Sequence, residues 1–259
     1  MPERLRQTPE SPYELNAEFI GFTKDQEKRA RQYIQDLGMP AQNIKRVVYR
    51  EARRGEEDIL GTWELYNGTL TFYKNLERFP PIAQLKTVAH EQSHSVSSLD
   101  PKNEKLYGGR QEQLIAARHI EAVANQSIIT RKYLNGYQAH LHRQYERDEI
   151  DFTRFAEETQ AIMMELRFTN PEHLEKIQKA QFVQIRKINS KHQGPAIMPV
   201  AIMTTEAQAQ KGLVGVDRTL SKLIPHLQTK ADIDSHVAEV RRKFLERGPI
   251  FPNRISKAA

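Results

Sequence analysis

Apolar residues recur at helical spacing along much of the chain, and capping residues mark the ends of several segments. Thr23 and Gln26 have the spacing of a capping box, an apolar stripe follows them, and Gly38 favours the end of this first helix. Asn170 and Pro171 favour the start of another helix. The same period predicts further helices at about 82–96, 111–131, 139–147, 152–168 and 231–248.

Strand signals are confined to the segment between the first two helices. "IKRVVYRE" is short and β-branched, and two runs rich in aromatic and β-branched residues flank Asn67 and Gly68 in "TWELYNGTLTFYK". An Asn-Gly pair between two such runs favours a two-residue type I′ turn. About three strands are therefore expected, in a small antiparallel sheet that precedes the helices. This order predicts an α+β fold rather than alternating βαβ units.

The two ends of the chain lack the regular pattern of the middle. Residues 1–18 contain three prolines without a clear period, so we expect a flexible tail. Beyond about residue 189 the period fades, and residues 189–259 are expected to form a C-terminal extension that is partly helical. The first residues lack the apolar core of a secretory signal, and no window approaches ~18 consecutive apolar residues. Cytoplasmic localisation without membrane association is therefore expected.

The composition is that of a folded but polar protein. Of the 259 residues, 38% are hydrophobic and 28% are charged, which is enough for a core. The 39 Lys and Arg exceed the 33 Asp and Glu, but the two signs are mixed along the chain, which disfavours a nucleic-acid partner. The absence of cysteine excludes disulfides, thiolate metal sites and cysteine nucleophiles.

The segment "KTVAHEQSHSV" contains His90, Glu91 and His94 in the order His-Glu-x-x-His. In a helix, residues four apart lie on one face, so both histidines can bind one metal ion. Glu91 can then reach a water molecule at an open coordination position. This arrangement is typical of zinc hydrolases, in which the imidazoles bind zinc and the carboxylate is the general base. The surrounding helical pattern favours this interpretation over a chance pair of histidines.

A catalytic zinc ion usually has three protein ligands, and two downstream glutamates are candidates for the third. Glu121 and Glu158 each interrupt an apolar helical stripe, where an unpaired carboxylate would be costly. Glu157 points to another helix face and is expected to be solvated. Glu165 follows Glu158 by two helical turns. It could hydrogen-bond to a metal ligand and so support the site, but we expect it to lie at the surface.

A His-Glu-x-x-His helix followed by a glutamate on a later helix resembles the gluzincin metallopeptidases. The segment from Glu157 to Glu165, followed by "RFTNPEHLEKI", is similar to the third-ligand helix of the lethal-factor-type zinc peptidases. This resemblance implies Glu158 as the third ligand and Ala161 as the small residue after it. A second resemblance, of "EAVAN" to the third-ligand helix of thermolysin-like or regulatory gluzincins, implies Glu121 instead.

The chain departs from the lethal-factor-type pattern at two positions. Gln160 stands where an aromatic residue is common, and Asp151 stands where this family often has a tyrosine that stabilises the oxyanion. The identity of an oxyanion-stabilising residue is therefore open.

The resemblance implies a zincin-like metallopeptidase domain at residues 19–188 with a peptide or protein substrate. Zinc would activate a water molecule, Glu91 would accept its proton, and "TLTFYK" would pair with an extended substrate by strand addition. The alternative is a non-catalytic or regulatory zincin-like protein that binds a protein or nucleic-acid partner.

Overall fold

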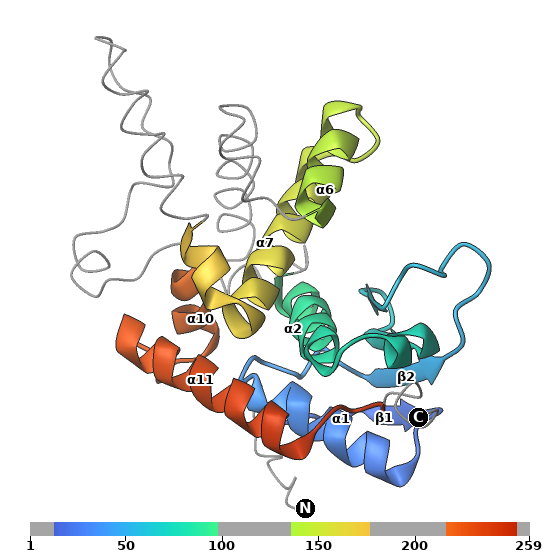
Figure 1. Cartoon of the computed structure of the whole chain (residues 1–259), viewed down its shortest axis with the longest axis vertical. Coiled ribbons are helices and arrows are strands. Elements are labelled where there is room, and N and C mark those ends of the chain that lie inside the picture. Colours follow the sequence, from blue (N-terminus) through green and yellow to red (C-terminus); the bar gives the residue numbers. More distant parts are fainter. Residues whose placement is uncertain (1–12, 98–135, 177–215, 253–259) are drawn as a thin grey trace, which may run out of the picture.

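The computed structural model describes residues 13–97, 136–176 and 216–252, and Figure 1 shows how their elements are arranged. The strands are β1 (Glu18–Ile20), β2 (Arg46–Arg50), β3 (Gly61–Glu64) and β4 (Thr69–Tyr73). The helices are α1 (Lys24–Asp36), α2 (Pro81–Ser97), α6 (Gly136–Glu146), α7 (Phe152–Thr169), α10 (Val216–Leu223) and α11 (Lys230–Arg247), with the 3-10 helix η1 (Lys74–Arg78) after β4. A small sheet thus accompanies long helices, and the predicted α+β class is confirmed.

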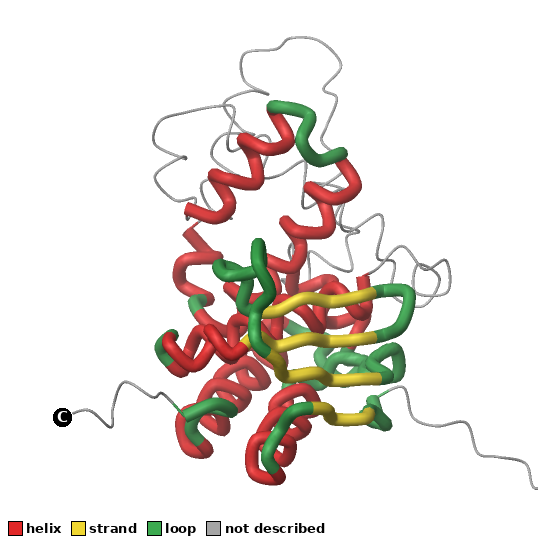
Figure 2. Tube along the Cα trace, turned by 90° about the vertical axis from the view of Figure 1, so that its right-hand side faces the viewer, coloured by secondary structure: helices red, strands yellow, loops and turns green. Residues whose placement is uncertain are grey.

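The sheet is mixed, so the prediction of an antiparallel sheet of about three strands was wrong. Its strand order is β1-β2-β4-β3; β1, β2 and β4 are parallel, and only β3 is antiparallel to its neighbour. The helix α1 connects β1 to β2, and such a crossover joins parallel strands. β1 has only three residues, too few to give a periodic signal. Figure 2 shows the four strands side by side, with β3 at one edge of the strand order.

The connection between β3 and β4 also differs from the prediction. The register pairs Glu64 with Thr69, so the loop has four residues, 65–68, instead of two. Gly68 has φ of +63°, but Asn67 has a negative φ, whereas a type I′ turn needs positive values at both positions. The Asn67 side chain accepts a hydrogen bond from Thr69 N (3.0 Å) and donates one to Glu64 Oε2 (2.7 Å). These bonds stabilise the longer loop.

One face of the sheet forms the floor of the apolar core. Val47 and Tyr49 on β2 pair in register with Leu70 and Phe72 on β4, and all four side chains are buried. Because side chains alternate along a strand, these four point to the same face. The helices supply the rest of this core, including the buried Tyr33 of α1.

The caps predicted at Thr23 and at Asn170 are present in the structure. Thr23 and Gln26 form a reciprocal capping box at the start of α1. Asp151 caps α7 and accepts a hydrogen bond from Arg154 N at 2.7 Å. At the end of α7, the Asn170 side chain accepts from the backbone of the next helical turn, as predicted.

The other helices agree with the pattern less uniformly. α2 and α11 cover the predicted segments, whereas α6 begins at Gly136, inside a predicted break. The predicted helix at 111–131 lies outside the described residues. Within the described part of the chain, no helix has both the length and the apolar character that a membrane crossing requires.

Part of the predicted N-terminal tail packs on the core. Leu15 and Ala17 are buried, and the Arg31 guanidinium donates a hydrogen bond to Leu15 O at 2.9 Å. The chain is therefore held in place shortly before β1 begins at Glu18.

The described residues of the predicted C-terminal extension complete the core. α10 and α11 pack against α7, and α11 also packs against α1 (Figure 1). On α7, the buried Arg167 is 2.7 Å from Asp217 of α10 and 2.5 Å from Asp234 of α11. This ion-pair network joins three helices.

Phe251, beyond α11, reaches the sheet. Its ring is fully buried and stacks on Tyr49, with centroids 4.1 Å apart. The buried side-chain amide of Gln84 on α2 forms two hydrogen bonds with the backbone of Phe251. Gln84 Nε2 donates to Phe251 O (2.8 Å), and Phe251 N donates to Gln84 Oε1 (2.9 Å). The C-terminal segment thereby fixes α2 relative to the sheet.

We expect Phe251→Ala to lower the free energy of unfolding by about 3–5 kcal/mol, because it leaves a ring-sized cavity beside Tyr49. Urea unfolding followed by circular dichroism measures this change. Tyr66→Ala is the matched control, because Tyr66 is fully exposed and its removal should change stability by less than about 0.5 kcal/mol. Equal losses for both variants would contradict the packing described here.

Candidate metal centre

The two histidines of the motif lie on the face of α2 that is turned towards α7. Lys86, His90 and His94 are four residues apart, so their side chains follow one another along this face. The opposite side of α2, including Leu85 and Val88, is buried in the apolar core. The side chains of His90 and His94 are only 12% and 10% exposed, so they are held in place by their surroundings.

Helix α7 supplies the carboxylates that face these histidines. Glu158 and Glu165 are seven residues apart and therefore lie on one face, two turns from each other. Both residues are only 4% exposed. The apolar residues between them, such as Ile162, anchor α7 in the core.

Ligand atoms of three residues converge between the two helices. His90 Nε2 is 3.2 Å from His94 Nε2 and 3.4 Å from Glu158 Oε2, and His94 Nε2 is 3.7 Å from Glu158 Oε1. Zinc bonds of about 2.0–2.1 Å at tetrahedral angles place ligand atoms about 3.3–3.4 Å apart. The residues therefore fit a small divalent metal ion. Among the described residues, no other group of three His, Asp or Glu side chains meets in this way.

The carboxylates around the two imidazoles favour a positive charge between them. Burial alone would lower the pKa of His90, but hydrogen bonds to the Glu158 and Glu165 carboxylates raise it to about 10. Burial would raise the pKa of Glu158, but hydrogen bonds to His90 and His94 hold it well below its usual range. Positive charge at the position between these side chains is thus stabilised by the surrounding carboxylates.

Glu165 orients His90, so the expectation of a surface position for Glu165 was wrong. Its Oε2 is 3.0 Å from His90 Nδ1, and its Oε1 is 3.0 Å from Lys86 Nζ. When a metal ion replaces the proton on Nε2, the remaining proton on Nδ1 is donated to Glu165, and the Nε2 lone pair is directed at the site. Carboxylates hold metal-binding histidines in this way and raise their basicity.

The three side chains border a cleft of about 380 Å³. Glu91 lies in its wall; it is 7% exposed, and burial raises its pKa above the usual range. Glu157, which was expected to be solvated, is half-buried and also lines the cleft. The remaining lining comes from Arg154 of α7 and from the β3 region: Ile59, Gly61, Thr62, Trp63 and Leu65.

The lack of a side chain at Gly61 lets β3 approach the motif helix. A Cβ atom at this position would lie 2.6 Å from Thr87 Cγ2 and 3.1 Å from Glu91 Cγ. The first distance is shorter than any ordinary contact. Any larger residue would therefore displace the strand from α2 or turn the Glu91 side chain.

Arg154 is a site residue that the sequence pattern did not predict. It lies one turn before Glu158 on α7, and its Nη2 is 2.5 Å from Glu158 Oε1. The spacing of four residues before a candidate ligand is the signal that could have found it. The other candidate third ligand, Glu121, lies outside the described residues.

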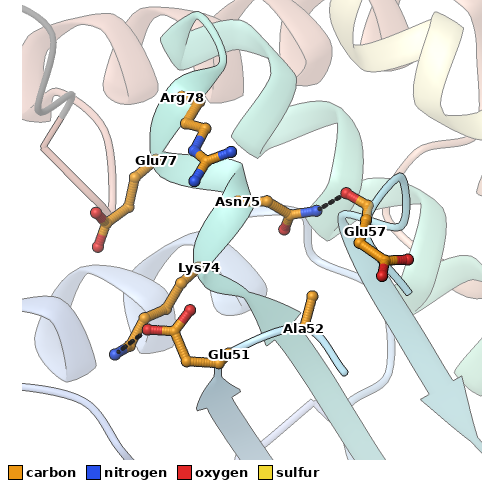
Figure 3. Close-up of a pocket in the computed structure, with 7 residues that line it drawn as sticks. All are labelled: Glu51, Ala52, Glu57, Lys74, Asn75, Glu77 and Arg78. Carbon is orange, nitrogen blue, oxygen red and sulfur yellow. Dashed lines mark hydrogen bonds and ion pairs between the residues drawn. The ribbon is translucent and has the colours of Figure 1, made fainter. Parts of the chain in front are cut away.

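A second pocket of about 590 Å³ lies where β2 and β4 end (Figure 3). Each of its acidic side chains already has an ion-pair or hydrogen-bond partner in the protein. Glu51 is 2.7 Å from Lys74, Glu57 accepts a hydrogen bond from Gly55 N, and Glu77 accepts one from the Tyr49 hydroxyl. The site between α2 and α7 is therefore the better candidate for chemistry.

Comparison with protein-family models, with curated proteins and with solved structures found no match to this chain. The functional interpretation therefore depends on the geometry of the site itself.

Proposed function

We propose that this chain is a zinc-dependent metallopeptidase, in which His90, His94 and Glu158 hold the metal ion and Glu91 is the general base. The proposal rests on the convergence of three ligand atoms within 4.8 Å of one another at a cleft that also contains Glu91. Three protein ligands leave a coordination position open, as catalytic zinc sites do and structural sites do not.

The donor set supports zinc as the metal. Two imidazole nitrogens and one carboxylate oxygen suit zinc better than Ca²⁺ or Mg²⁺, which prefer sites made of oxygen ligands. When bound, zinc would polarise a substrate carbonyl and increase the acidity of a water molecule.

The protein side chains divide the remaining tasks. Glu91, next to the ligands in the cleft wall, would accept a proton from the attacking water and pass it to the leaving amine. Glu165 would keep His90 in the orientation that directs Nε2 towards the metal ion.

An extended peptide could bind along β3. The sequence favoured substrate pairing with "TLTFYK", but Thr69–Tyr73 of this segment form β4, which lies between β2 and β3 and has no free edge. β3 is the edge strand on that side of the described sheet, and Gly61, Thr62 and Trp63 line the cleft. A peptide paired with β3 would pass in front of the candidate metal ligands.

Removal of the metal should abolish hydrolysis. We expect about one zinc ion per chain by elemental analysis, and cleavage of an internally quenched peptide mixture by the purified protein. Dialysis against 1,10-phenanthroline should reduce cleavage to background, and one equivalent of zinc should restore it. Hydrolysis by the metal-free protein, or none by a zinc-loaded protein, would refute the proposed function.

Replacement of Glu165 by glutamine should weaken metal affinity by about 10–100-fold, because His90 then loses the charged acceptor at Nδ1. Competition with a chromophoric zinc chelator measures the dissociation constant. Lys86→Met is the control, since it removes the second partner of Glu165 and leaves the contact with His90. Unchanged affinity in Glu165→Gln would show that this carboxylate does not support the site.

A further inference from the structure

One carboxylate in the cleft has no task in the proposed chemistry. Glu157 lines the cleft beside Glu158 and is half-buried. In the described part of the chain, its carboxylate has no hydrogen bond and no ion pair, in contrast to Glu158 and Glu165 on the same helix. Burial raises the pKa of the Glu157 carboxyl, so its ionised form costs free energy unless a cation compensates it. A half-buried carboxylate in a cleft therefore points to a role in binding.

His94 and Arg154 attract the Glu157 carboxylate electrostatically, but neither forms an ion pair with it. Arg154 is the cation of α7 that lines the cleft, and its Nη2 is 2.5 Å from Glu158 Oε1. The ion pairs of the described residues connect Arg154 with Glu158 and not with Glu157. As formed by the described residues, the cleft therefore presents an acidic group without an ion-pair partner, to which a cation of a ligand can bind.

The part of the cleft that β3 and its flanking residues line carries apolar side chains. Ile59 and Leu65, at the two ends of β3, are exposed apolar side chains, and Trp63 lies between them. A ligand that fills this cleft therefore meets apolar groups along β3 and a carboxylate on α7. A peptide with one apolar and one cationic group fits both walls.

We propose that Glu157 binds a cationic group of the substrate, namely a lysine or arginine side chain or the N-terminal ammonium group. The inference rests on the proposed function, because it assigns a substrate preference to the same cleft. Glu157 is then a specificity-determining residue, whereas Glu91 and the metal ligands carry out the reaction. The bond formed is an ion pair with hydrogen bonds, which requires no further cofactor.

The test uses hexapeptides in which one residue is leucine and the others are alanine. In each peptide one alanine is replaced by lysine, and in its partner peptide the same alanine is replaced by norleucine. The replaced position is moved along the peptide from one pair to the next. Norleucine has a similar aliphatic chain without the charge. The peptides are acetylated and amidated; a parallel norleucine set with a free N-terminus separates a side-chain cation from a terminal ammonium group. The ratio of kcat/KM for the lysine and norleucine peptides should be about tenfold or more at the preferred position.

Binding can be measured without turnover. Trp63 is the single tryptophan of the chain and lines the cleft, so its fluorescence reports a bound peptide. In the zinc-loaded Glu91→Gln protein, the best cationic peptide should bind about tenfold more tightly than its norleucine partner. Adding Glu157→Gln should reduce this ratio to about one, and Glu157→Lys should reverse it in favour of a glutamate peptide. Glu172→Gln, at an exposed glutamate that does not line the cleft, should keep the ratio.

The outcomes separate the two proposals. Equal affinities for both peptides, including no binding of either, would overturn the role of Glu157, and so would a ratio that Glu157→Gln leaves unchanged. Hydrolysis without a charge preference would leave the peptidase proposal intact. A charge preference in binding without any hydrolysis would refute the peptidase and retain Glu157 as a cation-binding residue.

Discussion

Glu91→Gln should lower kcat for peptide hydrolysis by about 10²–10⁴-fold while the protein keeps one zinc ion per chain. The substitution preserves the size of the side chain in the wall of the cleft and removes only its ability to accept a proton. Since Glu91 is not one of the three converging ligands, metal content should not change.

The experiment requires kinetics and elemental analysis on the same preparations. Glu172→Gln serves as the control, because it makes the same chemical change at an exposed position and should keep full activity. If Glu91→Gln retains more than about a tenth of the activity, Glu91 is not the general base. In a regulatory or non-catalytic protein, the substitution would leave partner binding as it was and there would be no turnover to lose.

Glu158→Ala should weaken zinc affinity by more than about 100-fold. This loss is larger than the loss expected for Glu165→Gln, because Glu158 is itself a metal ligand whereas Glu165 only orients the ligand His90. Glu158 is the one carboxylate among the described residues that meets both histidines. Zinc should raise the melting temperature of the native protein, which it binds in the folded state, and should not raise that of the variant.

Glu121→Ala is the decisive companion to this variant, because the sequence offers Glu121 as an alternative third ligand. We expect it to retain zinc with native affinity. Zinc loss in Glu121→Ala with retention in Glu158→Ala would reverse the assignment. Because Glu158 is buried, Glu158→Gln should be measured as well, to separate loss of a ligand from loss of packing.

Besides the fold class, the predictions that held were those based on residues within one helix or at its ends. The capping box at Thr23 and the spacing of His90 and His94 are local, so the period of the helix determines which side chains share a face. The same reasoning placed Glu158 on an apolar face, and the structure brings it to the two histidines.

Apart from the local turn at Asn67 and Gly68, the main failures concern contacts between distant segments. The role of Glu165 depends on Lys86 and His90 of another helix, which no periodicity along α7 reveals. The parallel pairing of β2 with β4 requires the chain to pass through the edge strand β3 before it returns to the middle of the sheet. The close approach of β3 to α2 depends likewise on a distant contact, which Gly61 allows. Propensity and period describe single elements, whereas these features arise only when the elements pack together.

The position of Phe251 has a consequence for synthesis of the protein on the ribosome. Gln84, on the helix that carries both histidines, is separated by 167 residues from its hydrogen-bond partner Phe251. At about 5–20 residues per second, the ribosome needs roughly 10–30 s to make that intervening stretch. During this time the side chain of Gln84 has no Phe251 backbone to bind, and the ring of Tyr49 is without the stacked ring of Phe251. The nascent chain therefore cannot complete the support of its motif helix until almost all of the described residues have been made.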